Sequence, residues 1–150
     1  MDKPNKRFST DELTNGILRT RDFKRYLNSN ADSLQEQTLQ DHLERLLQEK
    51  GMKRADVIQR ANLDRAFGYQ IFDGRKSPSR DKVIQLAFGF GLNYEETCEL
   101  LRVARKTALY ARIKREAILI YAIGHNLSVM ETQYMLMEAE LPPLGQEKDK

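Results

Sequence analysis

The stretch MKRADVIQRANLDRAFGYQIFDGRKSP, residues 52–78, decides the fold of this chain, because it predicts two short helices joined by a tight turn. One apolar face marks the first helix and is made by Val57, Ile58 and Ala61. Asn62 follows, and asparagine tolerates the left-handed backbone that a sharp turn between helices needs. Ile71 and Phe72 close the second helix ahead of a basic loop. This order is one by which proteins present a helix to the major groove of DNA.

Further helices are predicted on both sides of this pair. Residues 34–50 carry leucines at helical spacing, and the pattern ends at Gly51, a residue suited to the end of a helix. Ser79 and Asn93 are each placed to cap the start of a further helix. The five helices make residues 34–105 one helical domain.

The two ends of the chain are predicted to be helical as well. Residues 1–33 form an N-terminal helical arm, in which Ser9 begins a capping-box pattern. Residues 106–150 form a C-terminal helical hairpin and an acidic tail, with one helix over 108–124 and a last helix that starts at Ser128. No strand alternation is present, and no internal repeat is expected beyond the succession of helical hairpins. The chain is therefore predicted to be all-α.

Positive charge is concentrated in the middle of this chain of 150 residues, whose formal net charge is +3. Residues 53–82 hold eight basic side chains against four acidic ones, and residues 102–115 hold six basic side chains and no acidic one. A polyanionic partner, double-stranded DNA, fits this distribution. The alternative is a solvated helical surface on which salt bridges balance the charges.

The sequence also indicates a cellular compartment. Cys98 is the only cysteine, so no internal disulfide forms and a reducing compartment is expected. The first residues, MDKPNKRFST, contain no apolar signal core, and no uninterrupted apolar run approaches the ~18 residues of a membrane-spanning helix. We therefore expect a soluble cytoplasmic protein that does not enter a membrane.

Patterns typical of catalysis or metal binding are missing from the sequence. His42, His125 and Cys98 are its only histidines and cysteine, whereas a structural metal site needs four such ligands held close together. No nucleophile-elbow, P-loop or dinucleotide-binding pattern occurs. We expect neither a cofactor nor enzyme activity. We expect His42 on a solvated flank of its helix and His125 at a helix end.

The segment from Leu43 to Leu101 resembles the lambda-repressor-like (Xre-type) helix-turn-helix family. The resemblance rests on the spacing from the Leu46-Leu47 pair to Gly51, on the interval from Gly74 to Pro78, and on apolar positions that include Val57, Ile71 and Leu92. It implies a five-helix domain with an N-terminal helical arm and a C-terminal helical hairpin around it. It also implies a DNA-binding transcriptional regulator.

The resemblance places the start of the DNA-reading helix near Arg65. In this family type the first turn of that helix faces base edges, so Arg65 is the candidate for guanine and Ala66 for the methyl group of thymine. Tyr69 and Gln70 follow one turn later, and glutamine bonds adenine in the major groove. Phosphate contacts are implied for three more basic residues, Arg54, Arg75 and Lys76.

Each of these assignments has a structural alternative. Arg65 would pair with Asp64 or Asp81 on the surface, where an ion pair contributes little to stability. Tyr69 would belong partly to the core instead of facing DNA.

The chain departs from the family pattern at three positions. Asn62 stands where the turn commonly has glycine, Ile58 where the family has a small alanine, and Gly68 where it has a branched apolar anchor. Phe67 and Tyr69 flank Gly68, and they either repack to replace that anchor or form an exposed patch for a protein partner. The second case favours an alternative function, a protein-interaction adaptor or an antitoxin-like module that kept the fold with weak or no DNA reading.

One such domain is small for tight binding to DNA, so a homodimer on a two-fold operator is expected. The hairpin over 108–141 is the candidate dimer surface, because it has more apolar residues than one thin core needs. With Phe67, these residues make up the candidates for protein interaction: Ile118, Leu119, Ile123, Met135 and Met137. The alternative is that they complete the core of the monomer.

Overall fold

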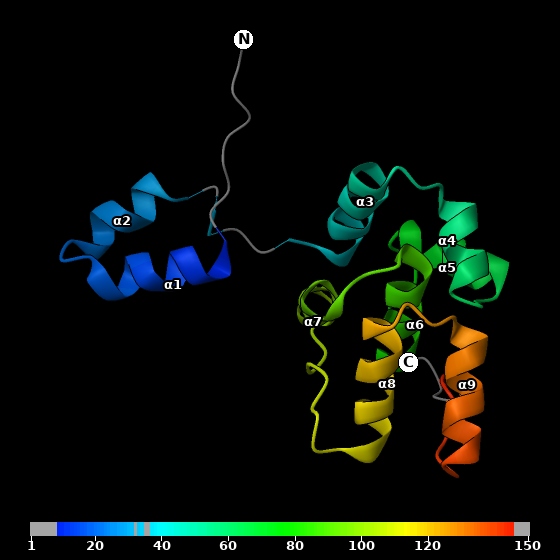
Figure 1. Cartoon of the computed structure of the whole chain (residues 1–150). Helices are drawn as coiled ribbons and strands as arrows, with labels where there is room; N and C mark the ends of the chain where they lie inside the picture. The colour runs from blue at the N-terminus through cyan, green and yellow to red at the C-terminus, as the bar shows by residue number, and fades with distance from the viewer. Residues whose placement is uncertain (1–8, 32, 35–36, 146–150) are drawn as a thin grey trace. The chain divides into compact units, whose positions relative to one another are not determined.

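The computed structural model describes residues 9–31, 33, 34 and 37–145, and all regular secondary structure in these residues is helical (Figure 1). This confirms the all-α prediction. The chain divides into two compact units, residues 1–36 and residues 37–150, which are described one by one below. Within the described residues, no helix is both long and apolar enough to cross a membrane.

The N-terminal unit contains two short helices, α1 (Thr10–Arg19) and α2 (Phe23–Ser29). The predicted capping box is present: the backbone N–H of Glu12 donates to the Ser9 hydroxyl at 3.1 Å. The hydroxyl of Tyr26 on α2 donates to the carbonyl oxygen of Leu13 on α1 at 3.1 Å, which ties the two helices together. Neither helix has a buried residue, so the apolar side chains of this unit remain largely exposed.

The second unit begins with five helices: α3 (Leu39–Lys50), α4 (Arg54–Arg60), α5 (Arg65–Phe72), α6 (Arg80–Phe90) and α7 (Tyr94–Val103). The helix expected over 34–50 starts later, because the Thr38 hydroxyl accepts the N–H of Asp41 at 3.1 Å and so caps α3 at Leu39. Residues 35 and 36 of that prediction lie outside the described residues. Gly51 ends α3 in the left-handed conformation, with φ at 62°, as the sequence indicated.

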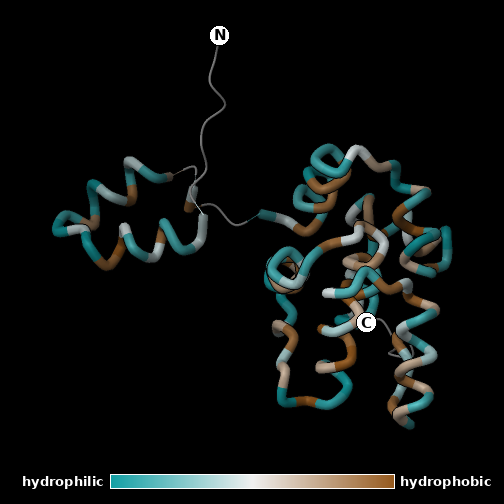
Figure 2. The backbone as a smooth tube through the Cα atoms, in the orientation of Figure 1, coloured by the Kyte–Doolittle hydropathy of each residue, from teal (hydrophilic) through white to brown (hydrophobic). Residues whose placement is uncertain are grey.

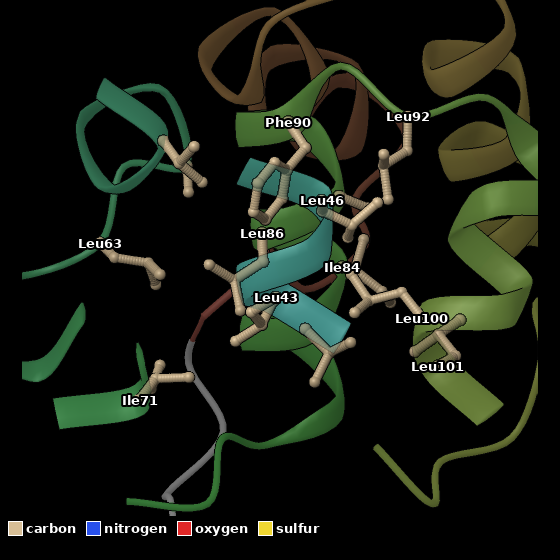
Figure 3. Close-up of a cluster of buried hydrophobic side chains, with 14 of the residues drawn as sticks. Leu43, Leu46, Leu63, Ile71, Ile84, Leu86, Phe90, Leu92, Leu100 and Leu101 are labelled. Carbon is tan, nitrogen blue, oxygen red and sulfur yellow. The ribbon is translucent and has the colours of Figure 1, made fainter. Parts of the chain in front are cut away.

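The core of this unit is formed by leucine, isoleucine, valine and phenylalanine side chains from α3 to α7. Hydrophobic residues recur along these helices (Figure 2). Figure 3 shows Leu43 and Leu46 of α3 lying beside Leu86 and Phe90 of α6, with the α7 leucines close by. All four named side chains are almost completely buried. The cluster fixes the helices on either side of the α4–α5 turn.

Two more helices, α8 (Lys114–Gly124) and α9 (Val129–Glu138), complete the unit. The helix expected over 108–124 therefore starts several residues late. Side chains hold the segment ahead of α8 in place: the Arg80 guanidinium donates to the carbonyl oxygens of Thr107 and Ala108, both at 3.0 Å. The N–H of Tyr110 donates to the Glu116 carboxylate at 2.8 Å.

The α8–α9 hairpin repeats the α6–α7 hairpin, so the succession of helical hairpins expected from the sequence contains a residue-by-residue correspondence that the sequence reading did not identify. Each residue of the first hairpin corresponds to the residue that lies as far beyond it in the sequence as Arg115 lies beyond Arg80. Arg80 pairs with Glu116 at 2.9 Å, and Arg115 pairs with Asp81 at 2.8 Å, so each hairpin supplies one arginine and one acid to the other. This reciprocity indicates an approximate two-fold axis between the hairpins.

The same relation holds for the residues around these ion pairs. Arg115 donates to the carbonyl oxygens of Pro142 and Pro143 at 2.9 and 3.0 Å, as Arg80 does in its own hairpin. The N–H of Gly145 donates to Asp81 at 3.1 Å, as that of Tyr110 does to Glu116. Matched backbone and capping features support the relation: left-handed Gly91 and Asn126, left-handed Arg105 and Glu140, capping boxes at Asn93 and Ser128, and buried Thr97 and Thr132.

The α8–α9 hairpin belongs to the same compact unit as the helices before it. Leu119 and Leu136 are completely buried in the core that α3 to α7 also form. The expected division between residues 105 and 106 falls inside this unit. Residues 146–150 of the expected acidic tail lie outside the described residues.

Candidate nucleic-acid interface

The turn between α4 and α5 is held rigidly at both of its ends. Asn62 has φ at 56°, the left-handed conformation that the sequence predicted. The next residue, Leu63, is buried, and Gln85 of α6 donates its amide N–H to the carbonyl oxygen of Ala61 at 3.0 Å. Asp64 then caps α5 by accepting the N–H of Phe67 at 3.0 Å. The direction of α5 is therefore set by buried contacts and not by the loop alone.

Ile58 and Gly68 are complementary where α4 packs on α5. Gly68 is buried, and a Cβ atom at this position would lie 2.7 Å from both Cγ1 and Cγ2 of Ile58. The larger residue on α4 thus occupies the space of the anchor missing from α5. The large residue at position 58 and the glycine at position 68 therefore compensate each other. Phe67 and Tyr69 also pack against the core, as the repacking alternative expected, although Ile58 is the residue that fills the space at Gly68.

Phe67 and Tyr69 are both half-buried and pack against the core. A cation lies over each ring: the Lys82 ammonium is 5.7 Å from the centre of Phe67, and the Arg65 guanidinium is 5.9 Å from the centre of Tyr69. The structure thus contradicts the exposed aromatic patch, because Gly68 is buried and both rings are partly covered.

The outward surface of α5 starts with Arg65 and Ala66, which are exposed. Tyr69 and Gln70 follow as half-buried residues one turn later. Within the described part of the chain, Arg65 makes no ion pair. Asp64 caps the helix and buried Asp81 pairs with Arg115, so neither acid is the partner that the structural alternative for Arg65 required.

Arg54 and Arg75, two of the expected phosphate contacts, are paired with acids in this structure. Arg54 bonds to Glu44 and lies 3.2 Å from Asp73, while Arg75 lies 2.9 Å from the same Asp73. The hydrogen bond to Glu44 is the main cause that raises the pKa of Arg54 above its usual value. All of these side chains remain at least one-third exposed, so the pairs are of the weak surface kind.

The loop after α5 is folded back onto the helix end. The backbone N–H groups of Arg75 and Lys76 both donate to the carbonyl oxygen of Gln70, at 2.9 and 3.2 Å. Gly74 has φ at 77°, a left-handed conformation that favours glycine. The loop therefore holds the exposed Arg75 and Lys76 next to the last turn of α5.

The hairpin residues expected to contact a partner divide into three groups. Leu119 and Ile123 are 0% and 4% exposed, so both belong to the core and neither is available to a partner. Ile118 and Met135 are half-buried, and Met137 is 64% exposed. For Leu119 and Ile123 the alternative prediction, completion of the monomer core, holds.

The histidines and the cysteine do not form a site. No group of three or more potential ligands is gathered anywhere in the described residues. His42 was expected on a solvated flank, but it is 3% exposed. Burial lowers the pKa of His42, and the nearby Arg45 lowers it further. His42 is therefore a core residue that favours its neutral form.

Three residues that shape the interface were missed from the sequence. They are Ile58 as the partner of Gly68, Lys82 over Phe67, and Gln85 as the brace of the turn. A glutamine in the middle of an apolar helix was the available signal for Gln85. No sequence signal connects Lys82 with Phe67, because their contact depends on how α5 and α6 pack.

Comparison of the chain with protein-family models, with curated proteins and with solved structures gives no match. The assignment of function therefore depends on the geometry of α4, α5 and the loop after them.

Proposed function

We propose that this protein is a DNA-binding transcriptional regulator in which α4, the turn and α5 act as a lambda-repressor-like helix-turn-helix. The observation that carries the proposal is Arg65. It is an exposed arginine in the first turn of α5, free of ion pairs among the described residues, and its guanidinium lies 5.9 Å from the Tyr69 ring centre. Contact with an aromatic face orients a guanidinium without neutralising its charge.

The rest of α5 supports the same role. Gly68, Ile71 and Phe72 bury one side of the helix, so the side with Arg65 and Ala66 is the one left for a groove. In this proposal the Arg65 fork pairs with the two acceptors of guanine, and Ala66 contacts the methyl group of thymine. Gln70 reaches adenine from the next turn.

Arg54, Arg75 and Lys76 contact phosphate in the same proposal. Glu44 and Asp73 balance the two arginines in the free protein, so of these three residues Lys76 alone has no acidic partner within the described part of the chain. Exposed ion pairs are worth at most about 1 kcal/mol, so phosphate oxygens are able to replace the two acids. This exchange predicts binding that weakens steeply as salt is added.

Fluorescence anisotropy of the full chain with the DNA upstream of its own gene tests the proposal, with a scrambled duplex measured in parallel across a range of salt. We expect a preference for the upstream DNA of about 10³-fold or more. Equal binding to both duplexes would indicate charge without readout at these sites. Absence of binding even at low salt would contradict the proposal and return attention to a protein partner.

A further inference from the structure

The second hairpin leaves open a face that the first hairpin buries. On α6, Leu86 and Phe90 are almost fully buried in the cluster with α3 (Figure 3). Their counterparts on α8 are Tyr121, which is 50% exposed, and the exposed His125. The two rings stack on each other with centroids 4.0 Å apart, and neither stacks on another ring among the residues that the structure describes.

The glycines of the two hairpins differ in the same way. A Cβ atom at Gly89 would lie 2.5 Å from the carbonyl oxygen of Val57, so α6 touches the backbone of α4 at this glycine. A Cβ atom at Gly124, its counterpart on α8, would meet nothing within 4 Å. A surface built for close helix packing in the first hairpin is therefore uncovered in the second.

The second helix of each hairpin shows the same contrast. On α7, Glu96 pairs with Lys50 of α3 at 2.9 Å. Its counterpart on α9, Glu131, is exposed and bonds only within its own capping box. Tyr134, which is 60% exposed, and the exposed Glu138 continue this side of α9. The open face thus has a tyrosine on each helix and acids on α9.

The basic residue that complements these acids is on the same face. Lys114 opens α8 and is exposed, with Ala117 and Tyr121 following on the same side of the helix. A face with a cation on one helix and acids on the other is complementary to itself. From this the geometry points to a homodimer, in which a second copy of the chain binds the open α8–α9 face across a two-fold axis.

The direction of the helices, together with a two-fold axis along the hairpin, determines how the charges meet in this proposal. Arg115 at the start of α8 donates to the carbonyl oxygen of Pro142 just after α9, at 2.9 Å, so the two helices are antiparallel with these ends together. A two-fold axis along the hairpin lays α8 of one copy antiparallel on α9 of the other. Lys114 then lies opposite Glu138 of the partner subunit, and this contact occurs twice.

Sedimentation equilibrium of the full chain without DNA tests this interface and is independent of the proposed DNA binding. We expect a dimer that dissociates on dilution. Lys114→Glu and Glu138→Lys should each weaken it by at least about tenfold, because each places like charges opposite one another in both contacts. Tyr121→Ser should weaken it without any change of charge. Glu95→Lys is the control, since Glu95 is exposed on α7 and so does not belong to the α8–α9 hairpin.

A mixture of the Lys114→Glu and Glu138→Lys chains gives the decisive measurement. In the mixed dimer both contacts again join opposite charges, so we expect recovery to near the affinity of the original chain. Circular dichroism of each variant checks that the helices are intact. A monomer at all concentrations, assembly beyond a dimer, or a dimer that ignores all three substitutions would overturn the proposal. Failure of the mixture to recover would overturn the pairing of Lys114 with Glu138.

Discussion

The side chain of Ile58 on α4 fills the space that a side chain at Gly68 on α5 would occupy. Two of its carbons lie 2.7 Å from the position of a Cβ atom at Gly68. The isoleucine is 2% exposed and the glycine is buried, so neither residue can shift without moving the other. The angle between α4 and α5 therefore depends on both residues together.

This contact predicts strong coupling between substitutions at the two positions. Gly68→Val should destabilise the fold by about 1–3 kcal/mol through overpacking against Ile58. Ile58→Ala should destabilise it by about 2–5 kcal/mol through the cavity that it leaves. The double variant Ile58→Ala/Gly68→Val should be more stable than Ile58→Ala alone, because the valine enters the vacated space. Urea denaturation followed by circular dichroism measures all three. Simple additivity would show that the contact is unimportant.

Arg65 and Arg54 should differ in their effects on DNA recognition. Arg65→Ala should remove about 1–3 kcal/mol of the preference for specific over scrambled DNA, because it removes a base contact. Arg54→Ala should weaken both complexes about equally and make binding less sensitive to salt. The salt-dependent anisotropy titrations measure both effects. Arg102→Ala on α7 is the control, since Arg102 is exposed and pairs with Glu99 far along the chain from α5. An equal loss for Arg102→Ala would argue against a localised interface.

The ion pair between Asp81 and Arg115 should be important for attaching the second hairpin. Asp81 is 2% exposed and its oxygens accept two hydrogen bonds from Arg115 and one from the N–H of Gly145. Asp81→Asn leaves the Arg115 charge unbalanced, and we expect a loss of about 3–5 kcal/mol in the free energy of unfolding. Adding Arg115→Met should recover part of that loss.

The exposed pair of Arg45 and Glu49 supplies the comparison for this prediction. Its side chains are 42% and 56% exposed, so Glu49→Gln should change the free energy of unfolding by less than about 1 kcal/mol. Thermal or urea unfolding measures both sets of variants. A similar small change for Asp81→Asn would mean that the hairpin is held by its apolar contacts alone.

His42 should make the fold less stable in mild acid. Burial, followed by Arg45, lowers its pKa in the folded state below the ordinary value of 6.5. As the pH falls below about 6.5, the unfolded chain takes up a proton that the folded chain refuses, so stability decreases until the folded-state pKa is reached. Urea unfolding at pH 7.5 and 5.5 should show this decrease, and His42→Leu should reduce it. His125→Gln, at an exposed position, should leave the decrease in stability unchanged. An equal decrease for the original chain, His42→Leu and His125→Gln would show that His42 is not its cause.

The sequence by itself determined the order of the helices and most of their ends. Local signals decide these features: Ser9, Asn93 and Ser128 form capping boxes with the glutamate three residues later, and Gly51 adopts the left-handed conformation that ends a helix. The start of α5 near Arg65 was instead implied by the family resemblance, and Asp64 caps the helix there. The all-α class needed nothing more than helical spacing and the absence of strand alternation.

Only the tertiary structure decided which residues of different helices contact one another. Arg80 of α6 donates to the carbonyl oxygens of Thr107 and Ala108 in the segment before α8, a contact that no local pattern predicts. The repeat of the hairpins became visible through reciprocal pairs such as Asp81 with Arg115, in which each hairpin supplies a charge to the other. Ile58 and Gly68 depart from a pattern separately but fit together in space. Such contacts join residues of different helices, and the spacing of residues along the sequence does not show which of them lie close together in the folded chain.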